Sequence, residues 1–290
     1  PLNDGRANVR FAANSANLYP FTDTNWDLRS ITFSNLPGMG SYHLHGSNIT
    51  LRSDNGTGIW QNAASSQIIS NNIIVASNQA WYAAGGDLVL GGVVAVGSNT
   101  LTLDGVYGFI MTNGSSLSLA GGSVNVTNVS LILCGDGGGS GVVRNVGGTS
   151  VVNGVLSLWR DSTVGVDAGQ LTFSTNIVGN SNLTKIGEGT LVLWGRDTVN
   201  VGYVSAGTLR LMSNTHTFSG GLTIESNATL EGVGAGVGGG PTTIGGILSP
   251  GTNGSISTLT FGSNLTLAAG STQYFSFNSP TAFDSNRVFG

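Results

Sequence analysis

The sequence predicts an all-β protein built as a parallel β-solenoid, and three observations carry this prediction. Short segments in which every second residue is apolar recur along the whole chain, and no window follows a helical period. Gly, Asn, Asp and Ser separate these segments. Two Gly-Thr-Leu triplets, Gly189–Leu191 and Gly207–Leu209, each open such a segment and lie 18 residues apart. A strand returning at that interval is the pattern of successive solenoid coils.

Each alternating segment is expected to form a strand with one buried face, because successive side chains point to opposite sides of a strand. The expected strands are Ile31–Phe33, Ile49–Leu51, Leu88–Leu90, Leu101–Leu103, Leu117–Leu119, Val124–Val126, Leu156–Leu158, Leu171–Phe173, Leu191–Leu193, Leu209–Leu211, Leu222–Ile224, Leu259–Phe261 and Leu265–Leu267.

An antiparallel sandwich also consists of many short strands, but the composition favours a solenoid. Charged residues make up 8% of the chain, against roughly 25% in ordinary globular proteins, and there are only 6 prolines to mark turns or guard strand edges. In a solenoid, equivalent residues stack about 4.8 Å apart. Repeated charge would then repel itself, whereas stacked Asn and Thr side chains form hydrogen bonds. With ~18–22 residues per coil, the chain would form roughly 13–15 coils and a rod of about 60–70 Å.

The chain divides into an irregular beginning and a regular remainder. Residues 1–27 are expected to form an N-terminal cap or connector, and residues 28–290 the solenoid. Gly232–Gly240 is expected to be a loop or a break in the stack. Pro1 at the start and the strand-like run Arg287–Gly290 at the end indicate a piece of a longer protein.

Charge and hydropathy exclude two classes of partner. The net charge is −4 and Lys185 is the single lysine, so we expect no nucleic-acid binding. No stretch of about 20 apolar residues is present, so we expect no membrane span in this segment. One cysteine, Cys134, excludes an internal disulfide framework, and its apolar run predicts a packed thiol.

Residues 183–275 resemble the bacterial autotransporter-associated β-strand repeat, also called the passenger-associated transport repeat. The segment Leu183–Leu193 reads Leu-Thr-Lys-Ile-Gly-Glu-Gly-Thr-Leu-Val-Leu, Ala206–Leu211 supplies the second Gly-Thr-Leu, and Asn214–Ile224 is a weaker copy. The resemblance implies a secreted or cell-surface, right-handed parallel β-helix with no universal catalytic residues. One departure is Trp194-Gly195-Arg196-Asp197, where the family usually has Ser-Gly-x-Asn.

That departure occurs twice, and it supplies the candidate interaction surface. The segments Leu156–Val164 and Leu191–Val199 are near copies offset by 35 residues. If their leucines point inward, Trp159 and Trp194 point outward or lie at a corner. The candidate surface residues are Trp159, Arg160, Asp161, Trp194, Arg196 and Asp197. They are open to three interpretations: a stacked aromatic ladder with Arg–Asp pairs between coils, a contact with another subunit, or a platform for a glycan.

No catalytic, cofactor or metal site is predicted. Asp161, Asp167 and Asp197 would support a polysaccharide-active enzyme only if they lay within roughly 10 Å in a cleft, and they are expected to be turn residues. His43, His45 and His216 lack partners at metal-ligand spacing. Gly135–Gly141 contains one Asp, too few oxygens for calcium, and is expected to be a loop.

The sequence therefore favours a non-enzymatic, extracellular structural solenoid that forms a surface stalk or a fibre segment, with end-to-end self-association as the expected contact. The alternative is an adhesin or carbohydrate-binding module that meets a glycan or a surface protein on its flank. A polysaccharide-active β-helix is the third hypothesis.

Overall fold

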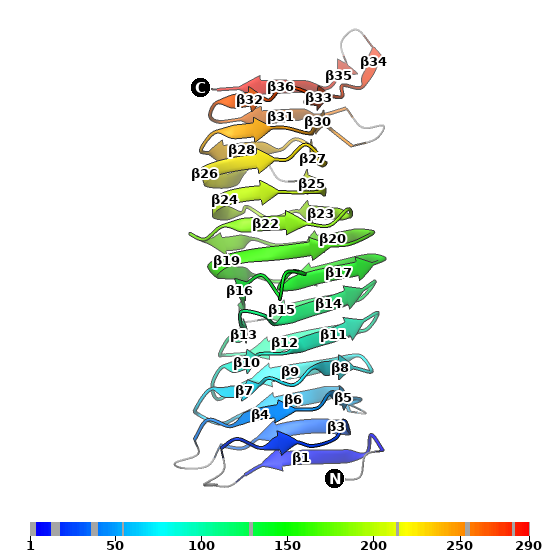
Figure 1. Cartoon of the computed structure of the whole chain (residues 1–290), viewed down its shortest axis with the longest axis vertical. Helices are drawn as coiled ribbons and strands as arrows, with labels where there is room; N and C mark the ends of the chain where they lie inside the picture. The colour runs from blue at the N-terminus through cyan, green and yellow to red at the C-terminus, as the bar shows by residue number, and fades with distance from the viewer. Residues whose placement is uncertain are drawn as a thin grey trace.

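The protein is a parallel β-solenoid that forms a straight rod, with its N-terminal strand at one end and its C-terminal strand at the other (Figure 1). The computed structural model describes residues 4–12, 18–35, 40–53, 55–127, 130–212, 215–252, 256–279 and 282–289. These residues contain no helix. Apart from the antiparallel hairpin β34 (Phe277–Ser279) and β35 (Ala282–Phe283), paired strands run parallel. The predicted all-β parallel solenoid is confirmed.

Three faces form the rod, and each coil passes through them in the order face 1, face 2, face 3. Each face is a stack of strands that pair across neighbouring coils. Face 1 consists of β2 (Phe21–Thr22), β4 (His43–Gly46), β7 (Gln67–Ile69), β10 (Leu88–Leu90), β13 (Phe109–Met111), β16 (Leu131–Gly135), the first part of β19 (Leu156–Val166), β21 (Ile177–Gly179), the first parts of β24 (Thr198–Val204) and β26 (His216–Ile224), β28 (Gly236–Gly239), β31 (Thr258–Phe261) and β36 (Ser285–Val288).

Face 2 follows the first corner of each coil. It consists of the first part of β3 (Trp26–Phe33), β5 (Ile49–Leu51), β8 (Ile73–Val75), β11 (Val93–Gly97), β14 (Ser116–Ala120), β17 (Val143–Gly147), the second part of β19, β22 (Leu183–Ile186), the second parts of β24 and β26, β29 (Thr242–Ile244) and β32 (Leu265–Leu267).

Face 3 closes each coil and carries the two Gly-Thr-Leu triplets. It consists of β1 (Ala7–Phe11), the second part of β3, β6 (Thr57–Gln61), β9 (Gln79–Ala83), β12 (Thr100–Gly105), β15 (Ser123–Thr127), β18 (Thr149–Asn153), β20 (Gln170–Phe173), β23 (Thr190–Leu193), β25 (Gly207–Leu211), β27 (Ala228–Gly232), β30 (Ile247–Pro250) and β33 (Thr272–Gln273). Leu191 pairs with Leu209, so the two triplets lie on successive coils, as predicted.

The stack holds about 11 to 12 coils, with 13 described strands on each of faces 1 and 3. This is fewer than the 13–15 coils expected, because several coils are longer than the predicted ~18–22 residues. Thr198 pairs with Thr217, 19 residues later, whereas Phe261 pairs with Val288, 27 residues later. At about 4.8 Å per coil the stack is about 55 Å long.

Alternation along each strand fills the interior of the rod. The inward residues of faces 1, 2 and 3 form one continuous apolar core that includes Phe33, Trp81, Phe109 and Phe173. Burying such a side chain stabilises the fold by about 1.5–3 kcal/mol. Because parallel pairing places each inward residue over its counterpart in the next coil, the core runs unbroken along the rod.

Polar side chains stack on the outside, as the low charge predicted. Asn25, Asn48 and Asn72 precede Trp26, Ile49 and Ile73, which are paired in register. The backbone N–H of Asn48 donates to the side-chain oxygen of Asn25 (3.1 Å), and the side-chain nitrogen of Asn72 donates to the side-chain oxygen of Asn48 (3.2 Å). Neutral ladders of this kind satisfy hydrogen bonds without accumulating charge.

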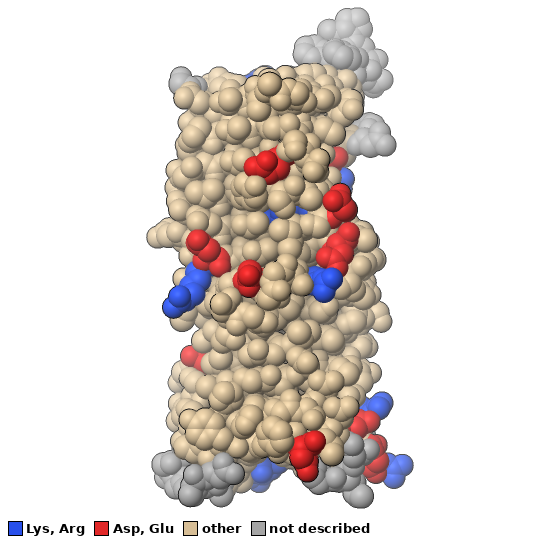
Figure 2. Space-filling model, in the orientation of Figure 1, with Lys and Arg blue, Asp and Glu red and all other residues tan. Residues whose placement is uncertain are grey.

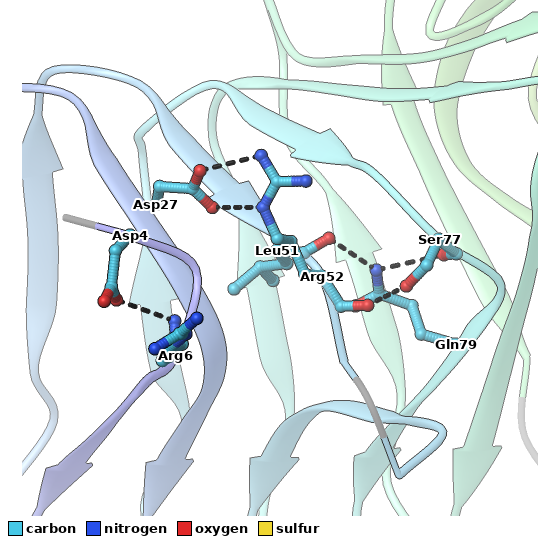
Figure 3. Close-up of polar contacts among 7 residues, drawn as sticks. All are labelled: Asp4, Arg6, Asp27, Leu51, Arg52, Ser77 and Gln79. Atoms are coloured by element: carbon cyan, nitrogen blue, oxygen red, sulfur yellow. Dashed lines mark hydrogen bonds and ion pairs between the residues drawn. The ribbon is translucent and has the colours of Figure 1, made fainter.

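Some of the few charged residues bridge neighbouring coils in opposite-charge pairs. Figure 2 shows how widely the charged residues are spaced on one face of the rod. Arg52 donates from Nε and Nη2 to the two carboxylate oxygens of Asp27 (2.7 and 2.8 Å; Figure 3) and so lowers the pKa of that carboxyl. Arg144 pairs with Asp167 and Arg210 with Glu231. Because these pairs are partly exposed to solvent, each of them stabilises the fold only weakly.

The glycines of the repeat motif permit close approach at the corner between faces 2 and 3. Gly187 has φ +83°, and a Cβ there would lie 2.3 Å from the Val166 carbonyl oxygen of the preceding coil. Gly207 occupies the equivalent corner of the next coil, with φ +66°, and a Cβ there would meet the Gly187 oxygen at 2.5 Å. Only glycine fits both the backbone conformation and the space.

Two sequence expectations about regularity need revision. Gly232–Gly240 does not break the stack, because β28 pairs in parallel with β26 and β31. The boundary at residue 27 falls inside β3, and β1 and β2 pair with β3 and β4, so the described part of 1–27 already contributes solenoid strands. Whether this segment acts as a cap or a connector stays a prediction.

Candidate functional site

Trp159, Arg160 and Asp161 lie where β19 turns from face 1 to face 2. The Trp159 side chain is 64% exposed, which confirms that it points outward. Asp161 accepts hydrogen bonds from the backbone N–H and the side chain of Asn182 in the next coil, both at 2.9 Å. Arg160 and Asp161 line a shallow surface hollow of about 570 Å³ together with Cys134. This corner presents an aromatic ring and a cation to solvent.

Trp194, Arg196 and Asp197 lie at a different corner, between face 3 and face 1. Trp194 follows β23 and is 53% exposed, again as predicted. Asp197, however, is only 2% exposed and cannot belong to an interaction surface. Its Oδ1 accepts the Ile177 N–H at 2.7 Å, and its Oδ2 lies 2.8 Å from Nδ1 of His216, which is fully buried. Asp197 is a structural residue of the corner.

The aromatic-ladder interpretation of the near copies is wrong. Leu156 belongs to face 1 and pairs with Ile177, whereas Leu191 belongs to face 3 and pairs with Leu171 and Leu209. Trp159 and Trp194 therefore cannot stack on one another. The Arg–Asp pairs expected between coils do not form at these residues either. Asp161 bonds to Asn182, and Asp197 bonds to Ile177 and His216.

The three carboxylates considered for catalysis lie at three separate corners. Asp161 is between faces 1 and 2, and Asp167 follows β19 between faces 2 and 3, where Arg144 holds it with a hydrogen bond of 2.9 Å from Nε. Asp197 is buried between faces 3 and 1. Paired-carboxylate hydrolysis needs two such groups within about 10 Å of one another in a cleft. These residues are corner residues, as the turn interpretation predicted.

The histidines form two unrelated groups. His43 and His45 lie side by side on face 1, with ring centroids 5.6 Å apart, next to the exposed rings of Tyr19 and Phe21. His216 pairs with Asp197, a partner that sequence spacing did not reveal. Over the described ranges, no three His, Cys, Asp or Glu residues are grouped to hold a metal ion.

Cys134 and Gly135–Gly141 occupy the corner beside Trp159. Cys134 is partly exposed rather than packed, and partial burial raises the pKa of its thiol. The glycine-rich segment leaves β16 as a loop, as predicted, and the loop contains a tight turn. The Asp136 carboxylate accepts the Gly138 N–H at 3.1 Å, and the Asp136 carbonyl accepts the Gly139 and Gly141 N–H groups. Asp136 is therefore used to shape the turn.

Lys185 is the residue whose role sequence reasoning missed. Its side chain is 1% exposed and points into the corner between faces 2 and 3. The ammonium donates to the carbonyl oxygens of Gly187 (2.6 Å), Ala206 (2.8 Å) and Ile186 (3.4 Å). Burial lowers its pKa from 10.5 to about 8, partly opposed by Glu188. The sequence held the signal: Lys185 lies two residues after Leu183 in the same strand and so shares its inward face.

The described residues include no helix that could span a membrane. Comparison with known proteins leaves the resemblance to the autotransporter-associated repeat as an expectation: no family model matches the chain, and no curated protein and no solved structure is significantly similar to it.

Proposed function

We propose that this chain is a non-enzymatic, structural segment of an extracellular rod, acting as a surface stalk or as part of a fibre. The observation that supports this proposal is the unbroken stack from β1 to β36, in which one apolar core and three ladders of backbone hydrogen bonds run the full length. Such a rod holds its two ends apart at a fixed distance. The extracellular location rests on the resemblance of residues 183–275 to secreted repeats.

The ends of the rod offer a means of extension. Among the described residues, β1 pairs only with β3, and β36 pairs only with β31. Each of these strands therefore has one open edge, whose N–H and C=O groups can receive another coil. That coil can come from the same polypeptide or from a second copy, and repeated addition of copies gives a non-closing, head-to-tail contact.

The orientation of β36 allows its open edge to be blocked without damage to the fold. Ser285 and Phe289 donate their N–H groups to Ser257 and Phe261 of the previous coil. Because alternate residues of a parallel strand bond to opposite neighbours, the N–H of Val288 points to the open edge. Proline at such a position removes only an outward donor.

We predict that the wild-type chain forms rods that join end to end, and that Val288→Pro leaves short single rods. Val288→Ala is the matched control, because it removes the side chain but keeps the N–H group. Negative-stain electron microscopy with light scattering measures the difference. A wild-type protein that stays monomeric at high concentration would contradict end-to-end association, and the stalk would be the remaining structural role. Polysaccharide hydrolysis by the purified chain would contradict the structural role itself.

A further inference from the structure

An open groove runs across the outer side of face 3 at the N-terminal end of the rod. Residues of β1, β3 and β6 and of the adjoining turns enclose about 490 Å³, within the ~300–1,000 Å³ typical of ligand sites. Its lining is polar, and Trp60 is the only aromatic side chain among the described residues that line it. The groove lies away from the corners of Trp159 and Trp194.

Trp60 forms an aromatic wall of the groove. Register places it between Thr32 and Tyr82 on neighbouring coils, and its ring lies 5.0 Å from that of Tyr82. The Tyr82 contact holds the indole in place, while 42% of Trp60 stays exposed. Its indole N–H has no hydrogen-bond partner within the described ranges. An amphipathic ring fixed at a groove can stack on the apolar face of a sugar and donate to a hydroxyl.

Hydroxyl and amide groups cover the floor of the groove. Ser30 donates to the Asn8 side-chain oxygen at 2.8 Å, which orders two neighbouring polar groups on adjacent coils. Thr32 and Asn62 also line the groove. These side chains combine donors and acceptors, the combination that sugar hydroxyls require.

Two arginines, Arg10 and Arg29, line the groove and give it a positive charge. The geometry of Arg10 suits it to bind an anion. Its Nε donates to Ser34 Oγ at 2.6 Å, and Ser34 is 5% exposed, so a buried hydroxyl anchors the guanidinium. Arg10 makes no ion pair with any residue that the structure describes. None of the described residues lining the groove is Asp or Glu, although the chain has a net charge of −4. The terminal nitrogens of such a guanidinium match a carboxylate or sulfate.

From these features we infer that the groove binds an acidic oligosaccharide, a function beyond that of a structural rod. Trp60 stacks on one sugar ring, Arg10 binds the carboxylate or sulfate, and Asn8, Ser30 and Asn62 bond to hydroxyls. A nucleic acid fits less well, because the net negative charge of the chain opposes a polyphosphate. Three successive coils of the rod would thus form a glycan-binding site on an otherwise structural element.

The test is an array of oligosaccharides bearing uronate, sialate or sulfate groups, printed beside their neutral counterparts, and followed by calorimetry on the best acidic glycan. We expect wild-type protein to prefer acidic glycans, and Trp60→Ala to weaken binding about tenfold. Arg10→Gln should reduce the preference for the acidic form at least severalfold, with Arg29 still in the groove. Raising the salt concentration should weaken wild-type binding, since salt screens exposed charges.

Trp159→Ala and Arg160→Gln are the matched controls, because they remove an exposed Trp and an Arg outside the groove. They should bind like the wild type, and circular dichroism should show all four variants folded. Absence of wild-type binding to every acidic glycan would overturn the inference. Loss of binding in Trp159→Ala but not in Trp60→Ala would overturn the assignment of binding to this groove. Equal binding of acidic and neutral glycans would overturn the role of Arg10. A fibre defect in Val288→Pro does not bear on these outcomes.

Discussion

At the scale of single residues, the inward-facing polar side chains satisfy the backbone at the corners of the coil. Gln61 donates to the Ala63 and Ser65 carbonyls, both at 3.0 Å, and Asn145 donates to those of Ala168 and Gly148 (2.9 and 3.2 Å). Lys185 does the same with an ammonium group. Buried carbonyl groups without a donor would each cost about 1–3 kcal/mol. These inward-facing polar side chains therefore allow the backbone to change direction at the corners without leaving buried carbonyl groups unpaired.

The pH dependence of stability should report on Lys185. Its pKa in the folded protein is about 8, below the ordinary value of 10.5. Between these values the unfolded chain holds a proton that the folded chain has released, so stability rises as pH increases through this window. The full difference is on the order of 3 kcal/mol. Chemical denaturation at pH 7.5 and 10.5 measures it.

Lys185→Met is the control for this prediction, because it keeps the apolar stem and removes the titrating group. The rise in unfolding free energy should be present in the wild type and absent in the variant. The other titratable groups occur in both proteins, so their contributions cancel in the comparison. Identical pH profiles would show that Lys185 keeps its ordinary pKa.

At the scale of strands and corners, position within the coil decides the role of a residue more than local sequence does. The near copies Leu156–Val164 and Leu191–Val199 place the same Asp at two corners with opposite environments. Asp161 is exposed and bonds to Asn182, whereas Asp197 is buried against His216. A repeated motif therefore does not imply a repeated site.

Substitution of these two aspartates should separate their environments. Asp197→Ala leaves the Ile177 N–H and the His216 ring without a buried acceptor and should lower the free energy of unfolding by about 3 kcal/mol. Asp161→Ala removes an exposed acceptor and should cost less than about 1 kcal/mol. Thermal or urea unfolding of both variants measures the contrast. Equal losses would contradict the assignment of Asp197 as a structural residue.

Local patterns sufficed for the strands but not for the corners. Alternation in Leu88–Leu90 and Leu101–Leu103 identified the strands, because burial of one face depends on the nearest neighbours in sequence. The corner of Asp197 depends on His216 in the next coil, and the length of that coil is not encoded in any short pattern. The offset of 35 residues between the near copies is no multiple of a coil, which is why they lie on different faces. The groove at Trp60 likewise requires β1, β3 and β6 to be placed side by side.

At the scale of the whole molecule, the rod is a one-dimensional stack in which each coil contacts its neighbours. Damage in one coil should therefore stay local. Phe109 is fully buried in β13, between Leu88 and Leu131 of the adjacent coils. Phe109→Ala should cost about 3–5 kcal/mol through the cavity it leaves.

Hydrogen exchange measured by mass spectrometry checks the range of this effect. Protection should fall in β10, β13 and β16 and persist in β31 and β36. Phe289→Ala, which removes an exposed ring near the C-terminal end, should leave the protection of β13 unchanged. A uniform loss of protection in Phe109→Ala would show instead that the coils unfold as a single cooperative unit.

The turn at Gly135–Gly141 shows that a coil can lengthen at its corner while its strands keep their register. A Cβ at Gly139 would meet no atom within 4 Å, so this corner opens directly into solvent. Peptides inserted at such corners would be displayed at set heights, about 4.8 Å apart per coil, and in three directions around the axis. The rod therefore acts as a scaffold of fixed spacing: the loop at each corner can be exchanged while the distance between successive corners stays the same.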